Sequence, residues 1–184
     1  SSLSSRLMMG ELGYGWKGNY STYAELINST TLAFHLPSGS TYQFTKVSGV
    51  WASEDARDKT QLSETTSAYI LTYIDGTVQT VSKSNMRTSL IRDNQGNELS
   101  FTYNGNQLQK IQHSDGQSLT FTWSSGKVAS VTDDQGRKVN YGYTGDLLTS
   151  VTAFNGLVTR YVYHTADSTP MSCALKQIVY PDGT

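Results

Sequence analysis

The chain has 184 residues and a formal net charge of −1 at pH 7, so no overall charge attracts nucleic acid or an anionic membrane surface. No apolar run approaches the ~18 residues that a membrane-spanning helix needs. We therefore expect neither a nucleic-acid partner nor a membrane span. Charged residues make up 16% of the chain, whereas Tyr and Gly number 12 and 16. This composition favours pleated strands joined by tight turns, with the hydroxyl-rich surface common in secreted β proteins.

Three consecutive regions are predicted along the chain. Residues 1–30 form an opening segment, in which the glycine-punctuated stretch 12–16 indicates ordered structure rather than a linker. Residues 31–92 are predicted to form irregular β-hairpins, with a loop over 53–67 that leaves a helical turn open as an alternative. Residues 93–184 form regular hairpins. No domain boundary is evident, and we expect one continuous structural unit built on one sheet.

A 20-residue period is the strongest signal in the sequence. Glycines recur every 20 residues from Gly76 to Gly156, most of them after a turn-forming residue, and one more follows near the end of the chain. Fixed spacing of this kind is typical of repeat architectures. The repeating glycines are Gly76, Gly96, Gly116, Gly136, Gly156 and Gly183.

Aromatic residues keep fixed distances from these glycines. Five residues after a glycine stand Phe101, Phe121, Tyr141 and Tyr161, and seven residues after stand Tyr103, Trp123, Tyr143 and Tyr163. Alternation with polar residues predicts a strand with one apolar face, followed by a turn and a second strand. The repeats therefore predict an antiparallel meander of hairpins that forms a curved, all-β sheet, with turns at 95–96, 115–116, 135–136 and 155–156.

The second strand of each repeat is less regular. Leu108 and Ile111 are three residues apart, which strict alternation would place on opposite faces. Either a β-bulge or a strand that begins late would reconcile them, and the sequence leaves both open. In the last repeat, residues 164–173 form an insertion that we expect to be a longer loop.

The repeats resemble a known family. The unit Asp-Gly-x2-Leu-x-Phe-x-Tyr/Trp, followed by Gly-x-Leu-x2-Ile/Val, resembles the YD repeats of bacterial RHS proteins and of the related animal teneurins. Residues 2–6 and 12–16 look like the segment that opens an RHS region, and residues 36–44 and 49–51 are similar to the next family block. The Tyr-Asp pair that names the repeat is absent, and Thr88 stands where the family's leucine is expected.

The resemblance implies a structural role. RHS repeats wind into a hollow shell that encloses a C-terminal toxin or effector domain. The chain is then expected to be the N-terminal fragment of such a repeat region, exported as part of a longer protein that is secreted or held at the bacterial cell surface. Its partners would be the rest of that shell and the enclosed toxin. Because a fragment leaves strand edges unpaired, we also expect edge-to-edge homo-oligomers in isolation.

The residues themselves indicate no enzyme. His35, His113 and His164 occupy unrelated positions without metal-ligand spacing, and Cys173 lacks the pattern of a catalytic nucleophile. The acidic stretches 93–98 and 133–136 are interpreted as hairpin turns rather than calcium loops, because the same positions recur in every repeat. We expect no metal and no cofactor. The alternative function is a carbohydrate-binding or adhesive module, in which exposed Trp123 and Tyr143 would stack on sugars.

Overall fold

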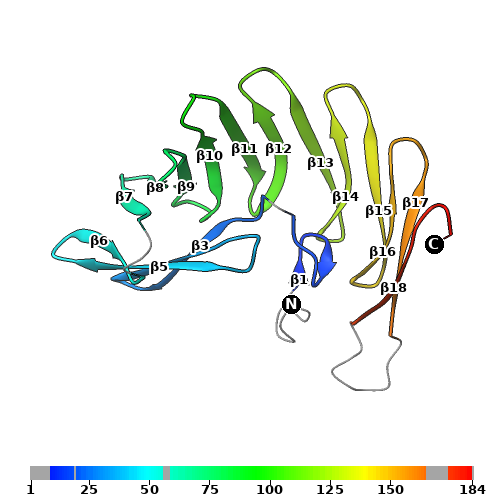
Figure 1. Cartoon of the computed structure of the whole chain (residues 1–184), viewed down its shortest axis with the longest axis horizontal. Coiled ribbons are helices and arrows are strands. Elements are labelled where there is room, and N and C mark those ends of the chain that lie inside the picture. Colours follow the sequence, from blue (N-terminus) through cyan, green and yellow to red (C-terminus); the bar gives the residue numbers. More distant parts are fainter. Residues whose placement is uncertain (1–8, 19, 56–58, 165–173, 184) are drawn as a thin grey trace. The chain divides into compact units, whose positions relative to one another are not determined.

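Every regular element of the protein is a β-strand in the part of the chain that the computed structural model describes, residues 9–18, 20–55, 59–164 and 174–183 (Figure 1). Neighbouring strands pair antiparallel, and hairpin follows hairpin in chain order. The prediction of an all-β antiparallel meander is therefore confirmed. Within these ranges no helix has the length and apolar character needed to cross a membrane.

The strands form three sheets of two, four and twelve strands. The smallest contains β1 (Met9–Gly10) and β2 (Gly13–Tyr14), and the second contains β3 (Tyr23–Asn28), β4 (Thr31–His35), β5 (Thr41–Val47) and β6 (Val50–Ser53). The largest contains β7 (Gln61–Glu64), β8 (Ala68–Thr72), β9 (Val78–Ser82), β10 (Thr88–Arg92), β11 (Glu98–Asn104), β12 (Gln107–His113), β13 (Ser118–Ser124), β14 (Lys127–Asp133), β15 (Lys138–Thr144), β16 (Leu147–Thr152), β17 (Val158–Tyr163) and β18 (Leu175–Val179). The chain divides into two compact units, residues 19–118 and residues 1–18 with 119–184.

The expectation of one continuous sheet is wrong, and the core of the unit 19–118 shows why. The four-stranded sheet packs its buried side chains against β7–β9 instead of joining them edge to edge. Phe34 of β4 is fully buried and meets Phe44 at 5.9 Å and Tyr69 of β8 at 6.4 Å, both edge to face. Trp51 of β6 meets the same Tyr69 at 6.3 Å. Burying each such ring contributes about 2–3 kcal/mol, which favours facing sheets over an extended one.

The predicted loop over residues 53–67 is also partly wrong. Gln61–Glu64 form strand β7, which pairs with β8 so that Leu62 lies opposite Leu71. Leu62 is buried in the core described above. A four-residue strand with a single apolar side chain carries too little alternation to be recognised from sequence.

The repeat turns share one hydrogen-bonding pattern. In the turn after β10, the amide of Gly96 donates to the carbonyl of Asp93, and the amide of Asp93 donates to the carbonyl of Asn97. Gly96 has φ +90°, the left-handed conformation that a type I turn followed by a bulge requires at this position. The same pair of bonds closes the turns that contain Gly76, Gly116, Gly136 and Gly156.

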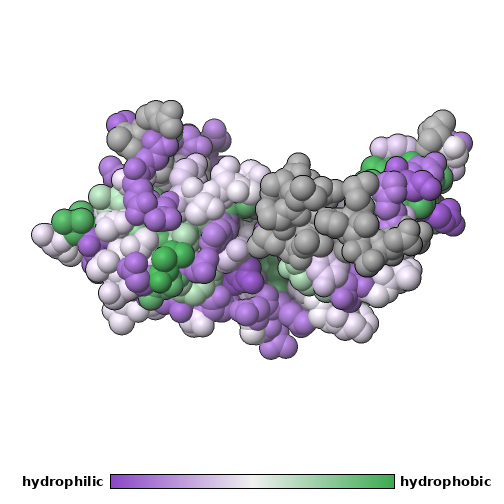
Figure 2. Space-filling model, turned by 90° about the horizontal axis from the view of Figure 1, so that it is seen from below, coloured by the Kyte–Doolittle hydropathy of each residue, from purple (hydrophilic) through white to green (hydrophobic). Residues whose placement is uncertain are grey.

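Exposed apolar side chains are few and scattered. Val47 and Val50, at the turn between β5 and β6, are among the more exposed at 62% and 68%. Figure 2 shows hydrophobic residues as small separate patches among hydrophilic and neutral ones on the face in view. The apolar residues of the hairpins are instead largely withdrawn from solvent, and they define the surface described next.

Candidate functional site: the aromatic face of the repeats

Each repeat contains a β-bulge at the same place in its second strand. Between β11 and β12, Thr102 pairs with Lys110 but Tyr103 pairs with Leu108, so that Gln109 is the extra residue. This settles the alternative that the sequence leaves open. Because Leu108 lies opposite Tyr103 and Ile111 lies opposite Phe101, the bulge returns both aliphatic side chains to the aromatic face. The equivalent extra residues of the other hairpins are Ser89, Ala129, Thr149 and Lys176.

Tyrosine hydroxyl groups bind the backbone beside these bulges. The hydroxyl of Tyr143 donates to the carbonyl of Val128 at 2.7 Å, and the hydroxyl of Tyr163 donates to the carbonyl of Leu148, also at 2.7 Å. Each carbonyl belongs to the residue just before a bulge, in the hairpin that precedes the tyrosine. Burial raises the pKa of Tyr143, so the hydroxyl remains a donor across the physiological range. The aromatic face thus ties each hairpin to its neighbour by a specific bond as well as by packing.

The structure places the predicted aromatic residues at graded depths. Phe101, Phe121 and Tyr163 are buried, with 8%, 3% and 8% of their surface exposed. The intermediate class contains Tyr103, Trp123, Tyr141, Tyr143 and Tyr161. Leu108, Val128 and Leu148 are buried beside them. In this respect the face has the character of a covered surface more than of an exposed stacking platform.

In the unit that joins residues 1–18 to 119–184, the opening hairpin β1–β2 lies against this face. The amide of Val128 donates to the carbonyl of Glu11 at 2.9 Å, and the amide of Tyr14 donates to the carbonyl of Asp146 at 3.0 Å. The indole of Trp16 donates to the hydroxyl of Tyr163 at 2.9 Å. The sequence indicates an ordered segment here, but nothing in it shows that the segment docks on residues more than 110 positions away.

Gly13 is the residue that permits this close approach. It has φ +90°, and a Cβ atom built on it would lie 2.4 Å from the carbonyl oxygen of Asp146. Trp16 completes the contact by packing edge to face on Tyr161, with ring centroids 4.9 Å apart. The aromatic residues of stretch 12–16 are therefore ligands of the repeat face, and its glycines make room for the backbone.

The first repeat replaces apolar packing with a polar network. Thr88 is fully buried, and its hydroxyl accepts a hydrogen bond from the side-chain amide of Gln79 at 2.7 Å. The carbonyl oxygen of that amide accepts a bond from the hydroxyl of Tyr73 at 2.6 Å. Because Gln79 and Thr88 are both polar, the departure at Thr88 is matched on the neighbouring strand. Met86 packs against the core of the same unit.

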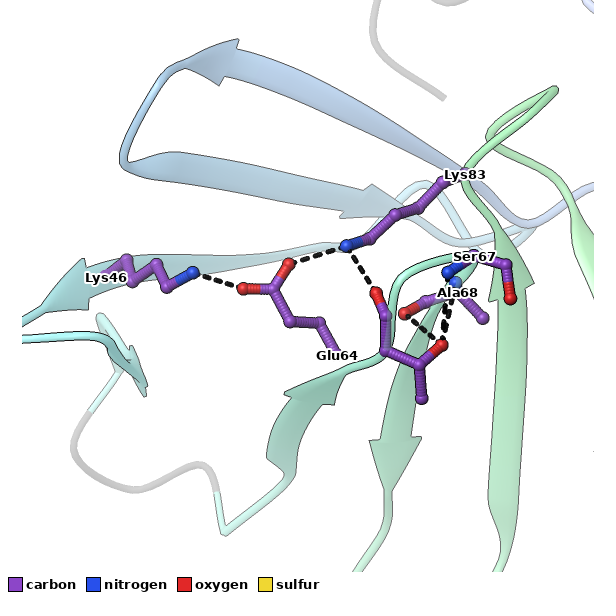
Figure 3. Close-up of polar contacts among 6 residues, drawn as sticks. Lys46, Glu64, Ser67, Ala68 and Lys83 are labelled. Carbon is purple, nitrogen blue, oxygen red and sulfur yellow. Dashed lines mark hydrogen bonds and ion pairs between the residues drawn. The ribbon is translucent and has the colours of Figure 1, made fainter.

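A three-residue ion-pair cluster joins the two facing sheets of the unit 19–118 (Figure 3). Glu64 of β7 lies between Lys46 of β5 and Lys83, which follows β9. The ammonium of Lys83 is 2.7 Å from the Glu64 carboxylate and donates to the carbonyl of Thr65 at the same distance. Hydrogen bonds from Lys46 and Lys83 lower the pKa of Glu64 to about 2. With both ammonium groups engaged, the cluster serves as a clamp between strands.

His35 lies in a second polar chain, on the four-stranded sheet. Its Nε2 is 2.9 Å from the Glu25 carboxylate and its Nδ1 is 3.3 Å from the Thr41 hydroxyl, while its ring stacks on Tyr23 at 4.6 Å. Both ring nitrogens are thus engaged within the sheet. His113 pairs with Asp115 at 2.8 Å in a repeat turn. Across the described residues, no three His, Cys, Asp or Glu side chains gather as metal ligands, while Cys173 lies outside those ranges.

Compared with known proteins, the chain matches no protein-family model and no curated protein sequence.

Proposed function

We propose that the chain is a structural scaffold, the N-terminal part of an RHS-type wall that encloses a C-terminal toxin or effector domain and is exported with it. The proposal has no catalytic step and no cofactor. One observation carries it: the turn, the bulge and the tyrosine-to-carbonyl bond recur at the same positions of successive hairpins. A unit whose contacts with the next unit are identical can be added many times, and its stability accumulates with each copy.

The aromatic face supports the same reading. A wall needs an apolar face that is covered and a polar face that is wet, and the hairpins divide their side chains in this way. In β13, Phe121 is buried, whereas its neighbours Thr120 and Thr122 are exposed. The docked hairpin β1–β2 covers part of the aromatic face in the unit that contains it.

Protease protection in the native source tests the scaffold proposal. The protein is isolated at its natural length, and the segment that follows residue 184 is identified by mass spectrometry. We expect this segment to resist a protease that digests it once the wall has been unfolded with urea. A natural protein that ends at residue 184, or a following segment digested equally fast in both conditions, would contradict the proposal.

Carbohydrate binding is the second candidate, and the geometry gives it less support. Trp123 and Tyr143 are both partly exposed, but the hydroxyl of Tyr143 is committed to the carbonyl of Val128. Sugar stacking needs an open ring face and polar groups free to bind hydroxyls. A glycan array with the unchanged chain and with Trp123→Ala separates the candidates: saturable binding that this substitution abolishes, with the circular dichroism spectrum unchanged, would favour the adhesive function.

A further inference from the structure

Strand β18 presents an open edge at one end of the twelve-stranded sheet. It pairs with β17 on one side, through Arg160 with Val179 and Tyr161 with Ile178. On its other side no strand lies among the described residues. The edge of β3 differs, because the amide of Ala24 donates there to the carbonyl of Met86. An open edge of unpaired amide and carbonyl groups is a template for a further strand.

The preceding repeats show which groups of β18 face outward. In β14, Val131 pairs with Val139 of β15, in the same register as the turn bond from the Asp133 amide to the Arg137 carbonyl. Because alternate residues of an antiparallel strand bond to opposite neighbours, the amide and carbonyl of Val131 point toward β15. Ile178 stands five residues before Gly183, as Val131 stands five before Gly136. Its amide and carbonyl therefore point to the open edge.

We propose that this edge pairs with β18 of a second copy of the chain, antiparallel about a two-fold axis at Ile178. In this register Ile178 of one copy lies opposite Ile178 of the other, and Gln177 lies opposite Val179 on either side. A strand can meet itself in this way because an antiparallel pair about a two-fold axis needs only one sequence. No like charges face each other at these three positions, and two isoleucine side chains meet on one face.

The composition of β18 favours the pairing. Leu175, Ile178 and Val179 have high strand propensity, and the only charge is that of Lys176, at the bulge. Leu175 is 39% exposed and Tyr180, just after the strand, is 52% exposed. Natural edge strands are usually protected by proline or by several charges within the strand, and β18 has neither. The inference rests on this edge alone and stands or falls independently of the proposed function.

Sedimentation equilibrium of the 184-residue chain gives the first test. We expect the weight-average mass to rise from 20.2 kDa toward twice that value as the concentration increases from about 10 µM to about 1 mM, a range suited to a small interface. Ile178→Pro removes the outward amide, a change that edge strands tolerate, and should weaken association at least about tenfold. Ile178→Val should associate like the unchanged chain. A constant mass of 20.2 kDa would overturn the proposal.

Crosslinking tests the register and covers the case in which Ile178→Pro does not fold. Cys173, the only cysteine, is first replaced by serine. Ile178→Cys should then form an intermolecular disulfide on oxidation, because directly paired residues lie within disulfide reach. Val179→Cys is the matched control, since its opposite residue in this register is Gln177. Equal crosslinking of the two cysteine variants, or none with Ile178→Cys, would overturn the two-fold pairing.

Discussion

The hydroxyl of Tyr143 is expected to carry a measurable share of the stability of its unit. Tyr143→Phe keeps the ring but leaves the carbonyl of Val128 without its donor, which costs about 1–2 kcal/mol for a partly buried acceptor. Tyr141→Phe is the matched control, on the same strand and face, because Tyr141 makes no hydroxyl hydrogen bond in the described part of the chain. Urea unfolding measures both. Equal losses would show that the tyrosine-to-carbonyl bond contributes nothing.

Glu64 should make the stability of its unit sensitive to acid. Its folded pKa of about 2 lies below the ordinary value of 4.5. The carboxylate therefore stabilises the fold above about pH 4.5, and this contribution is lost as the pH falls toward about 2. Because a quarter of the side chain is exposed, solvent screening limits the effect to roughly 1–2 kcal/mol.

A comparison with Glu64→Gln isolates this residue from the other carboxylates. The difference in free energy of unfolding between the unchanged chain and Glu64→Gln should be largest above pH 4.5 and should close near pH 2. Glu98→Gln, which removes an exposed pair with Arg92, should cost roughly 0–1 kcal/mol. A difference for Glu64→Gln that stays constant with pH would contradict the clamp.

At the scale of the hairpins, the opening hairpin should dock only when residue 13 is glycine. Gly13→Ala places a Cβ atom against the carbonyl of Asp146 and also carries the cost of a positive φ. Gly96→Ala is the matched control, with the same φ of +90° and no atom within 4 Å of the added Cβ. Its cost, about 1–2 kcal/mol, is conformational alone.

Hydrogen exchange separates the two costs. In Gly13→Ala the amides of Tyr14 and Val128, which bridge the hairpin and the repeats, should lose protection while the amides of β15 keep theirs. In Gly96→Ala both bridging amides should remain protected. Unchanged protection of Tyr14 in Gly13→Ala would mean that the backbone accommodates the methyl group and that the close approach is not required.

The hairpins themselves follow from sequence, because turn glycines and alternating aromatics are local signals repeated five times. The pairing register within a hairpin is not local in this sense. A bulge at Gln109 and a late strand start give the same spacing of Leu108 and Ile111, and only the partner strand distinguishes them. The docking of residues 9–16 was beyond reach for a similar reason, since no period relates Trp16 to Tyr163. Strand β7 was missed because Leu62 is its only apolar residue.

At the scale of the whole chain, the unit that joins residues 1–18 to 119–184 is assembled from segments distant in sequence. The bond from Trp16 to Tyr163 spans 147 positions, whereas the bonds of each repeat turn span four or fewer. Local contacts form before contacts that close a long loop, because the entropy of closure must be offset first. The repeats should therefore fold early, and the opening hairpin should dock after the rate-limiting step.

Stopped-flow kinetics tests this order. Trp16→Leu removes the indole donor and the contact with Tyr161, which should cost about 2 kcal/mol. If docking is late, nearly all of this loss appears as faster unfolding, roughly 30-fold, with the folding rate almost unchanged. Val128→Ala, within the buried face of one hairpin, is the contrasting variant and should slow folding. A Trp16→Leu variant that slows folding as much as Val128→Ala does would place the opening hairpin in the folding nucleus and reverse the proposed order.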